Sequence, residues 1–363
     1  MIYTLRHYLF FIILVGILSA SFHGLGLIKA VPWHLVYSDT LGFFDRVAAP
    51  GFAYISKPIE YPILTGFFIQ LAGMIGKTKA GYYLASITGL IACAAIATYF
   101  LCQILPELQR GRLLKYWIFA PSMLIFLTSN WDVFAITLVA IFFYLLYKEQ
   151  PYWASFFLAL AFSAKFYPIL YLAPLLLKKP NLKEWLKILG IFSITVLALN
   201  GYFLIYHFNT WSYFYTLNTF RDPNPDSIWT IIRYFIYPME VKTVNWLSLI
   251  LFGSSYFYLI WRHRRESLLK LFMLATLLFV LCNKIFSPQY VLWLLPFFVL
   301  YFPPPSFWFY LLEFSNLAAF FAILPWFFLG HNLFYFYLSA PFVILRHIVL
   351  FYIFFKALDK KSN

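Results

Sequence analysis

The sequence predicts an all-α polytopic membrane protein with about twelve transmembrane helices. Hydrophobic residues make up 63% of the chain and charged residues only 11%, too few charges for a water-soluble surface. Apolar runs of roughly 15 to 24 residues recur along the chain, as helices that cross a bilayer require. No stretch alternates with a period of two, so a β-barrel is not expected. We expect one integral membrane domain over residues 1–363.

The expected helices are the apolar segments that lie between polar or basic breaks. In chain order they are roughly residues 8–28, 82–105, 113–128, 131–147, 152–166, 167–177, 185–208, 243–261, 268–282, 290–302, 306–327 and 334–355. The first is longer than a usual signal-peptide core and lacks a small-residue cleavage site, so we expect it to be retained.

One further apolar segment, Tyr61 to Gly76, does not fit the alternation of sides. It is short for a span, and a full crossing would place the basic stretch after it outside, against the charge rule. We expect it to dip into the outer leaflet or to lie along it. Lys77 and Lys79 favour the opposite, a full crossing.

The basic residues orient the protein in the membrane. The net charge of +14 does not indicate nucleic-acid binding, because the lysines and arginines fall mainly in short breaks between apolar runs. The strongest clusters lie within residues 178–187 and 262–265 and in the Lys360-Lys361 tail, which we assign to the cytoplasm. Both termini then lie inside, in a cytoplasmic-type (inner) membrane. Cys93, Cys102 and Cys282 have no spacing that indicates disulfides or zinc.

With this orientation, polar residues gather on the outer face from distant parts of the chain. The first outer loop, about residues 30–68, is expected to carry short helices and holds three acids in a chain with 13. The charged residues expected outside are Asp39, Asp45, Glu60, Asp132, Lys165, Arg221, Asp222, Asp226 and Lys284. This clustering on one face predicts a site near the outer boundary of the membrane.

The acids of this face allow two interpretations. Asp39, Asp45 and Asp132 are each compatible with a solvated loop or a helix cap, and Glu60-Tyr61 lies between two prolines that suit a helix start. A carboxylate near the apolar boundary is also suited to act as a general base, because partial desolvation raises its basicity.

The cations also allow two interpretations. Lys165 is flanked by apolar residues, so it either extends to the lipid headgroups or binds an anion. Arg221 carries a guanidinium, which suits bidentate phosphate contact, although Trp229 could simply anchor this loop at the interface. Within the apolar segments, Glu313 and Arg346 are expected at similar depth in the inner half of the membrane. We expect them to form a structural ion pair; a role in transport is the alternative.

Four stretches carry recognisable motifs. They are the first loop from Asp39 to Leu64 with E-Y-P-I-L, F-S-A-K-F-Y-P at Phe162 to Pro168, Arg221 to Trp229, and N-K-I-F-S-P-Q-Y-V-L-W-L-L-P at Asn283 to Pro296. Together they resemble motifs of the GT-C superfamily of polyprenyl-phosphate-sugar-dependent glycosyltransferases, in particular the GPI mannosyltransferase I family and related bacterial alpha-mannosyltransferase-like membrane enzymes. The first loop departs from the family pattern D-x-D, since Thr40-Leu41 follows Asp39. Without the second acid we expect no metal.

The resemblance implies an inverting transfer of a hexose, with mannose the expected sugar, from a polyprenyl-phosphate carrier to a lipid or glycan acceptor, with no cofactor. Asp39 would be the base on the acceptor hydroxyl. Lys165, Arg221 and Lys284 would bind the carrier phosphate. The pocket would be formed by Asp45, Glu60, Tyr61, Asp132, Tyr167, Asn224, Ser227, Gln289 and Tyr290.

Two other functions remain compatible with the sequence. A flippase or transporter for a lipid-linked sugar would use Glu313 and Arg346 as its coupling pair. A scaffold subunit of a glycosylation complex would need no catalytic residue. The gathering of polar residues on one face, rather than along a path across the membrane, favours the enzyme.

Overall fold

A computed structural model describes residues 3–179 and 181–360, and its regular elements are helical apart from one isolated bridge between Ala53 and Lys57. The all-α prediction is confirmed. Lys361, part of the predicted basic tail, lies outside the described residues.

Six helices in the described part of the chain are long and apolar enough to cross a membrane. They are α1 (Leu5–Leu27), α5 (Lys79–Ile104), α11 (Leu182–Tyr206), α15 (Val241–Arg262), α18 (Ser306–Phe328) and α19 (Leu333–Asp359). The helices α11 and α15 expose large apolar side chains such as Ile194, Leu249 and Ile250. Such faces suit lipid rather than water.

The other predicted segments form shorter apolar elements. They are α4 (Ile63–Ile75), α8 (Asp132–Tyr147), α9 (Pro151–Ala164), η4 (Tyr167–Tyr171) with α10 (Leu172–Leu177), α16 (Leu268–Cys282), and η5 (Pro288–Trp293) with α17 (Leu295–Leu300). At 1.5 Å per residue, even the 16-residue α8 is about 24 Å long, less than the bilayer core of about 30 Å. The structure therefore supports a helical membrane protein but not a count of twelve spans.

The predicted segment 113–128 is broken rather than continuous. It consists of α6 (Gly111–Leu113), the π-helical turn η3 (Leu114–Ile118) and α7 (Pro121–Phe126). Pro121 begins α7, where its missing N–H costs nothing, but the ring cannot continue a helix from the preceding turn.

The remaining short elements lie in the connections. They are η1 (Trp33–Leu35), α2 (Asp39–Gly42), α3 (Phe44–Ala48), η2 (Glu107–Gln109), α12 (Phe208–Trp211), α13 (Tyr213–Phe220) and α14 (Ile228–Phe235). Serine side chains begin two of them: Ser38 accepts from the Leu41 N–H at the start of α2, and Ser227 from the Thr230 N–H at the start of α14.

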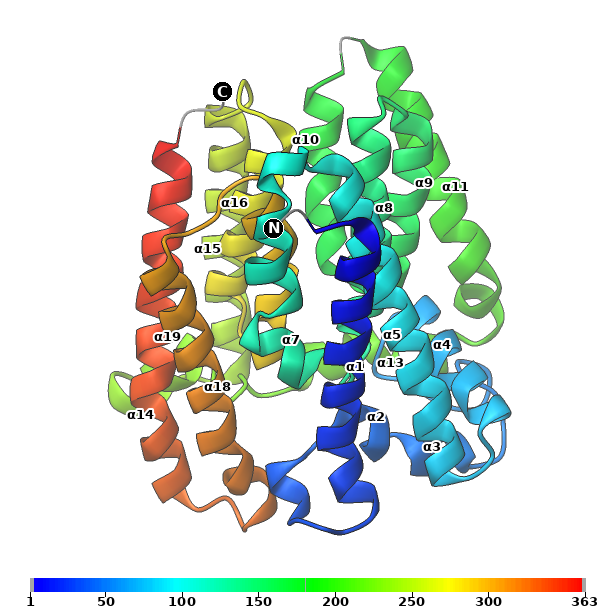
Figure 1. The fold of residues 1–363 in the computed structure, drawn as a ribbon, viewed down its shortest axis with the longest axis vertical. Coiled ribbons are helices and arrows are strands. Elements are labelled where there is room, and N and C mark those ends of the chain that lie inside the picture. The colour runs from blue at the N-terminus through cyan, green and yellow to red at the C-terminus, as the bar shows by residue number, and fades with distance from the viewer. Residues whose placement is uncertain (1–2, 180, 361–363) are drawn as a thin grey trace.

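The helices stand roughly side by side and divide the molecule into two ends (Figure 1). The start of α1, the end of α19 and the turn between α15 and α16 lie toward the upper end, whereas α2 and α3 lie toward the lower end. The main core packs α7, α8, α9 and α16 against η5 and α17, around buried rings such as Trp117, Phe142 and Phe272. This core fixes the lower ends of these helices, where the polar residues gather.

Candidate active site

Asp39 is the first residue of α2 and is held against the turn that precedes α8. The Thr40 N–H donates to the Ser129 carbonyl oxygen at 3.1 Å, and the Thr40 hydroxyl donates to the Thr128 carbonyl oxygen at 2.9 Å. Both contacts are buried, and they bring the first loop beside Asp132, the first residue of α8.

Two tyrosines hydrogen-bond the half-buried carboxylate of Asp39. The Tyr37 hydroxyl donates to Oδ1 at 2.6 Å, and the Tyr61 hydroxyl donates to Oδ2 at 3.3 Å. Burial raises the pKa of Asp39, and the negative charges of Glu60 and Asp132 raise it further, against the opposing effects of Tyr37 and Lys165. A carboxylate with a raised pKa is a stronger base than one in water.

Lys165 and Asp132 form a buried ion pair beside Asp39. The Lys165 Nζ lies 2.5 Å from Asp132 Oδ1, and their side chains are 15% and 1% exposed. Lys165 directly follows α9, and the Thr65 hydroxyl of α4 donates to the carbonyl oxygen of Ala164, the last residue of α9, at 2.7 Å. That contact sets Tyr61, just before α4, against Lys165.

Aromatic rings surround the Lys165 ammonium. Its Nζ lies 5.3 Å from the ring centroid of Tyr61, 5.6 Å from that of Tyr290 and 5.8 Å from that of Trp293. Trp293 is stacked between two tyrosines, with centroids 3.8 Å from Tyr290 and 4.2 Å from Tyr167. Tyr167 and Trp293 are buried, so Tyr290 is the accessible end of this stack.

A second set of cations lies on the loops before α14 and after α16. Arg221 is exposed, and its Nη2 donates to Asn224 Oδ1 at 2.7 Å; within residues 3–179 and 181–360 no carboxylate lies at ion-pair distance from it. The buried Lys284 donates to the carbonyl oxygens of Thr219 and Arg221 at 3.2 and 2.7 Å. Burial and the nearby Arg221 lower the pKa of Lys284 to about 8.

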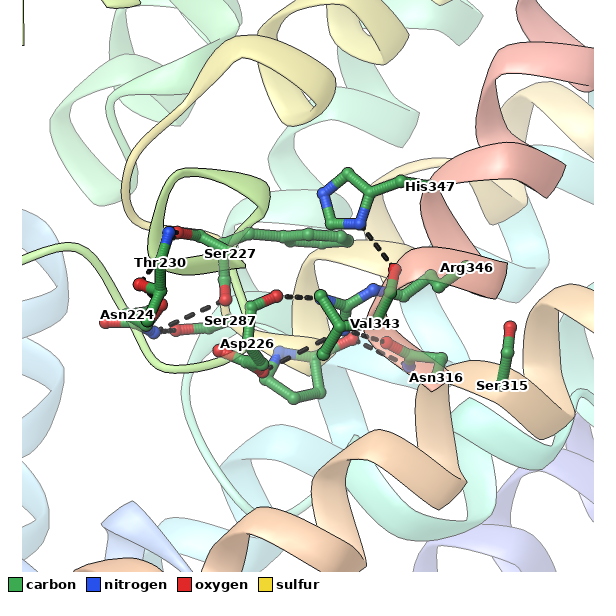
Figure 2. Close-up of polar contacts among 12 residues, drawn as sticks. Asn224, Asp226, Ser227, Thr230, Ser287, Ser315, Asn316, Val343, Arg346 and His347 are labelled. Carbon is green, nitrogen blue, oxygen red and sulfur yellow. Dashed lines mark hydrogen bonds and ion pairs between the residues drawn. The ribbon is translucent and has the colours of Figure 1, made fainter. Parts of the chain in front are cut away.

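The two loops are joined by Asn224. Its N–H donates to the Lys284 carbonyl oxygen at 3.0 Å. Its side-chain amide donates to the Phe286 carbonyl oxygen at 3.3 Å and to the Ser287 hydroxyl at 3.2 Å; Figure 2 shows Asn224 beside Ser287. Tyr290 connects this region to the first, because it lies six residues after Lys284 and its ring centroid is 5.6 Å from Lys165 Nζ.

Two hollows border these groups. A groove of about 210 Å³ between α15 and α16 is lined by Asn245, Ser248, Leu249, Phe252, Phe279, Asn283 and Lys284. A cavity of about 770 Å³ lies between the end of α1 and the start of α5, and its wall includes Lys29, Trp33, Leu41 and Lys79. The second reaches Leu41, two residues after Asp39.

Most of the predicted residues therefore fall into two neighbouring groups. Asp39, Tyr61, Asp132, Lys165, Tyr167 and Tyr290 form one, and Arg221, Asn224, Ser227 and Lys284 form the other. Gln289 is half-buried beside Tyr290.

The other two acids of the first loop form no hydrogen bond or ion pair with these groups: Glu60 is half-buried, and Asp45 is exposed. Glu60 is 2.5 Å from the exposed Arg46, which restrains the loop next to Tyr61. Asp45 is exposed at the start of α3, and none of the polar contacts among the described residues involves it.

The predicted ion pair between Glu313 and Arg346 is wrong. Glu313 accepts from the backbone N–H and hydroxyl of Ser122 at 2.7 and 2.6 Å, whereas Arg346 lies beside Asp226. The prediction placed Asp226 at the outer face and Arg346 at the depth of Glu313 in the inner half of the membrane, but Asp226, on the loop before α14, is buried beside Arg346 of α19. Burial raises the pKa of Asp226 to about 6, against the effect of Arg346.

Sequence reasoning missed three aromatic or polar neighbours of the site. Tyr37 lies two residues before Asp39, and Trp131 precedes Asp132 and packs on the Tyr61 ring at 5.1 Å. The sequence did carry a signal for these two residues, because an aromatic residue lies within two positions before each acid. Asn316 on α18 gave none, because a single buried amide in an apolar helix has no distinguishing pattern.

No metal-binding group is evident in the described residues, where no three His, Cys, Asp or Glu side chains converge. That the reaction needs no metal stays a prediction.

The chain is similar to known glycosyltransferases over a region that contains most of this site but begins after Asp39. The profile of glycosyltransferase family 87 matches residues 60–288. GPI mannosyltransferase 1 of Candida albicans is 23% identical over 299 residues, which cover 73% of this chain and 72% of the relative. The predicted resemblance to GT-C-like, mannosyltransferase-type enzymes is confirmed.

Proposed function

Because this chain belongs to glycosyltransferase family 87, we propose that it transfers a hexose, mannose in the first instance, from a polyprenyl-phosphate carrier to a lipid or glycan acceptor. The observation that carries the proposal is the grouping of a desolvated carboxylate, Asp39, with cations that come from three other segments. A base for the acceptor and positive charge for a departing phosphate are the two requirements of such a transfer.

In the proposed reaction, Asp39 takes the proton of the acceptor hydroxyl. The hydroxyl oxygen bonds to the anomeric carbon as the bond from that carbon to the carrier phosphate breaks, with inversion. The bonding electrons leave with the phosphate, whose growing negative charge is stabilised by Arg221 and Lys284. Lys165 already has Asp132 as its counterion, so it supplies less net charge than either of them.

The groove between α15 and α16 supports a lipid-linked donor. Its wall combines the apolar Leu249, Phe252 and Phe279 with the buried ammonium of Lys284. An isoprenoid chain would lie along the apolar side chains with its phosphate near Lys284, whose charge would draw the phosphate in. Tyr290, the accessible end of the aromatic stack, would pack against the sugar.

The site would face the outside of a cytoplasmic membrane. The arginine-bearing turn between α15 and α16 lies at the opposite end of the bundle from α2, which begins with Asp39 (Figure 1). Basic turns are retained in the cytoplasm, so this arrangement favours an outer active site.

The flippase alternative is less well supported, because its expected coupling residues Glu313 and Arg346 bind different partners and not each other.

The direct test is to incubate purified protein with radiolabelled polyprenyl-phosphate-mannose and candidate glycolipid and glycan acceptors, with and without EDTA. Label moving to an acceptor, equally in EDTA, supports the proposal and its metal independence. Movement of intact donor across a vesicle membrane without transfer would instead indicate a flippase.

A further inference from the structure

The loops that carry Arg221 and Lys284 rest on two fully buried polar side chains from the last two helices, Asn316 of α18 and Arg346 of α19 (Figure 2). Neither helix lies within the region that matches the family, and no sequence motif marks them. Burying a guanidinium between apolar helices costs desolvation free energy. The contacts that Arg346 makes therefore indicate its role.

Arg346 reaches from α19 to the loop that follows Arg221. Its Nη2 donates to the Asp226 carbonyl oxygen, and its Nη1 lies 3.8 Å from Asp226 Oδ2. The guanidinium also lies over the Phe286 ring, 3.8 Å from its centroid, in the segment that carries Lys284. One side chain thus contacts both loops.

Asn316 completes the arrangement. Its Oδ1 accepts from Arg346 Nη1 at 2.9 Å, and its Nδ2 donates to the Pro288 carbonyl oxygen at 2.9 Å. The amide therefore fixes the guanidinium on one side and the start of η5 on the other. Since η5 carries Tyr290 and Trp293, the same contact orients the aromatic stack beside Lys165.

We propose that Arg346 and Asn316 are positioning residues that hold the two cation-bearing loops, residues 221–227 and 284–288, in the geometry that binds the carrier phosphate. The proposal rests on the proposed function in assigning the phosphate to Arg221 and Lys284. Neither Arg346 nor Asn316 touches the substrate; each acts through the loop backbone. The C-terminal helices then serve as the support of the donor site rather than as additional membrane anchors.

The test compares Asn316→Ala and Arg346→Lys with Glu313→Gln as a matched control. Glu313 is equally buried and lies one turn before Asn316 on α18, but it contacts Ser122 of α7, and glutamine keeps an acceptor there. Two quantities are measured on purified protein: KM and kcat for polyprenyl-phosphate-mannose, and hydrogen exchange in residues 221–227 and 284–288.

The first two variants should raise the donor KM about tenfold, with a smaller change in kcat, and should speed exchange in both loops. The control should leave the loops and KM unchanged. Unchanged KM and exchange in Asn316→Ala, or exchange that rises in α18 and α19 but not in the loops, would overturn the proposal.

Asn316→Ala leaves the Arg346–Asp226 contact in place, so it carries the test if Arg346→Lys does not fold. If the wild-type protein transfers nothing from this donor, the proposed function fails, while the exchange measurement still decides whether these residues hold the loops.

Discussion

Asp39 and Lys165 share a neighbour, the Tyr61 side chain, and this sharing joins the base to the cations of the site. The Tyr61 hydroxyl donates to Asp39, while its ring faces the Lys165 ammonium. Burial raises the pKa of the Tyr61 hydroxyl well above its ordinary value, so it remains a hydrogen-bond donor. The Tyr61 hydroxyl therefore remains available to orient Asp39.

The pH dependence of transfer follows from Asp39 and Lys284. Asp39 acts as a base only when ionised, so activity should fall as the pH drops through its raised pKa, at a higher pH than for an exposed aspartate. Lys284 binds phosphate only when protonated, so activity should also fall as the pH rises through about 8. Initial rates of transfer measured across the pH range give both the acid limb and the alkaline limb of this pH profile.

Lys284→Arg is the control for the alkaline limb, because a guanidinium keeps its charge to about pH 12. The limb near pH 8 should disappear in this variant. Its persistence would show that another group causes it.

The Asp132–Lys165 pair should act as a structural unit. Replacing Asp132 by Asn leaves the Lys165 ammonium without its counterion and should cost about 3–5 kcal/mol of stability. Changing both residues, Asp132→Asn with Lys165→Met, should cost less than the single change. Thermal unfolding in detergent measures the difference, and additive losses would contradict the pairing.

At the scale of elements, short contacts between helix ends position the site. The α2 start binds the turn before α8 through Thr40, and α4 binds the end of α9 through Thr65. The helices α4 and α5 approach so closely at their turn that a Cβ on Gly76 would lie 2.0 Å from the Gly81 carbonyl carbon. Backbone cannot move aside as a side chain can.

Gly76→Ala should therefore separate α4 from α5 and shift Tyr61, which precedes α4. We expect a loss of about 1–3 kcal/mol and lower transfer activity. Gly190→Ala on α11 is the matched control, because nothing lies within 4 Å of a Cβ there. Thermal unfolding midpoints and transfer rates are measured for both variants. Equal losses in Gly76→Ala and Gly190→Ala would contradict the proposed close contact between α4 and α5.

The sequence predicted the positions of most helices because long apolar runs bounded by basic breaks are a strong signal. It also brought Asp39, Asp132, Lys165, Arg221 and Lys284 to one face from charge and motif alone. The partners were not predictable. Arg346 was paired with Glu313 because both were expected at similar depth, but the loop before α14 places Asp226 beside it. The position of that loop depends on packing between α14, α18 and α19, which leaves no local pattern in the sequence.

At the scale of the whole molecule, α2 and α3 lie at the opposite end of the bundle from the turn between α15 and α16 (Figure 1). Asp39 begins α2, the exposed Asp45 lies in α3, and the turn between α15 and α16 carries arginines. If the site faces outward, a membrane-impermeant maleimide should label Asp45→Cys in intact spheroplasts and Arg264→Cys only after permeabilisation.

The wild-type chain supplies the background for this labelling experiment, because its cysteines are buried or half-buried within helices. The opposite labelling pattern would place the site in the cytoplasm and would exclude the proposed outer-face reaction.

The role of Asp39 is the central claim, and single-turnover transfer by Asp39→Asn tests it most directly. The variant keeps the side-chain shape and an acceptor for Tyr37 but cannot take a proton. We predict that transfer from radiolabelled polyprenyl-phosphate-mannose falls by at least about a hundredfold, while donor binding is largely retained. Turnover near the wild-type rate would contradict the account.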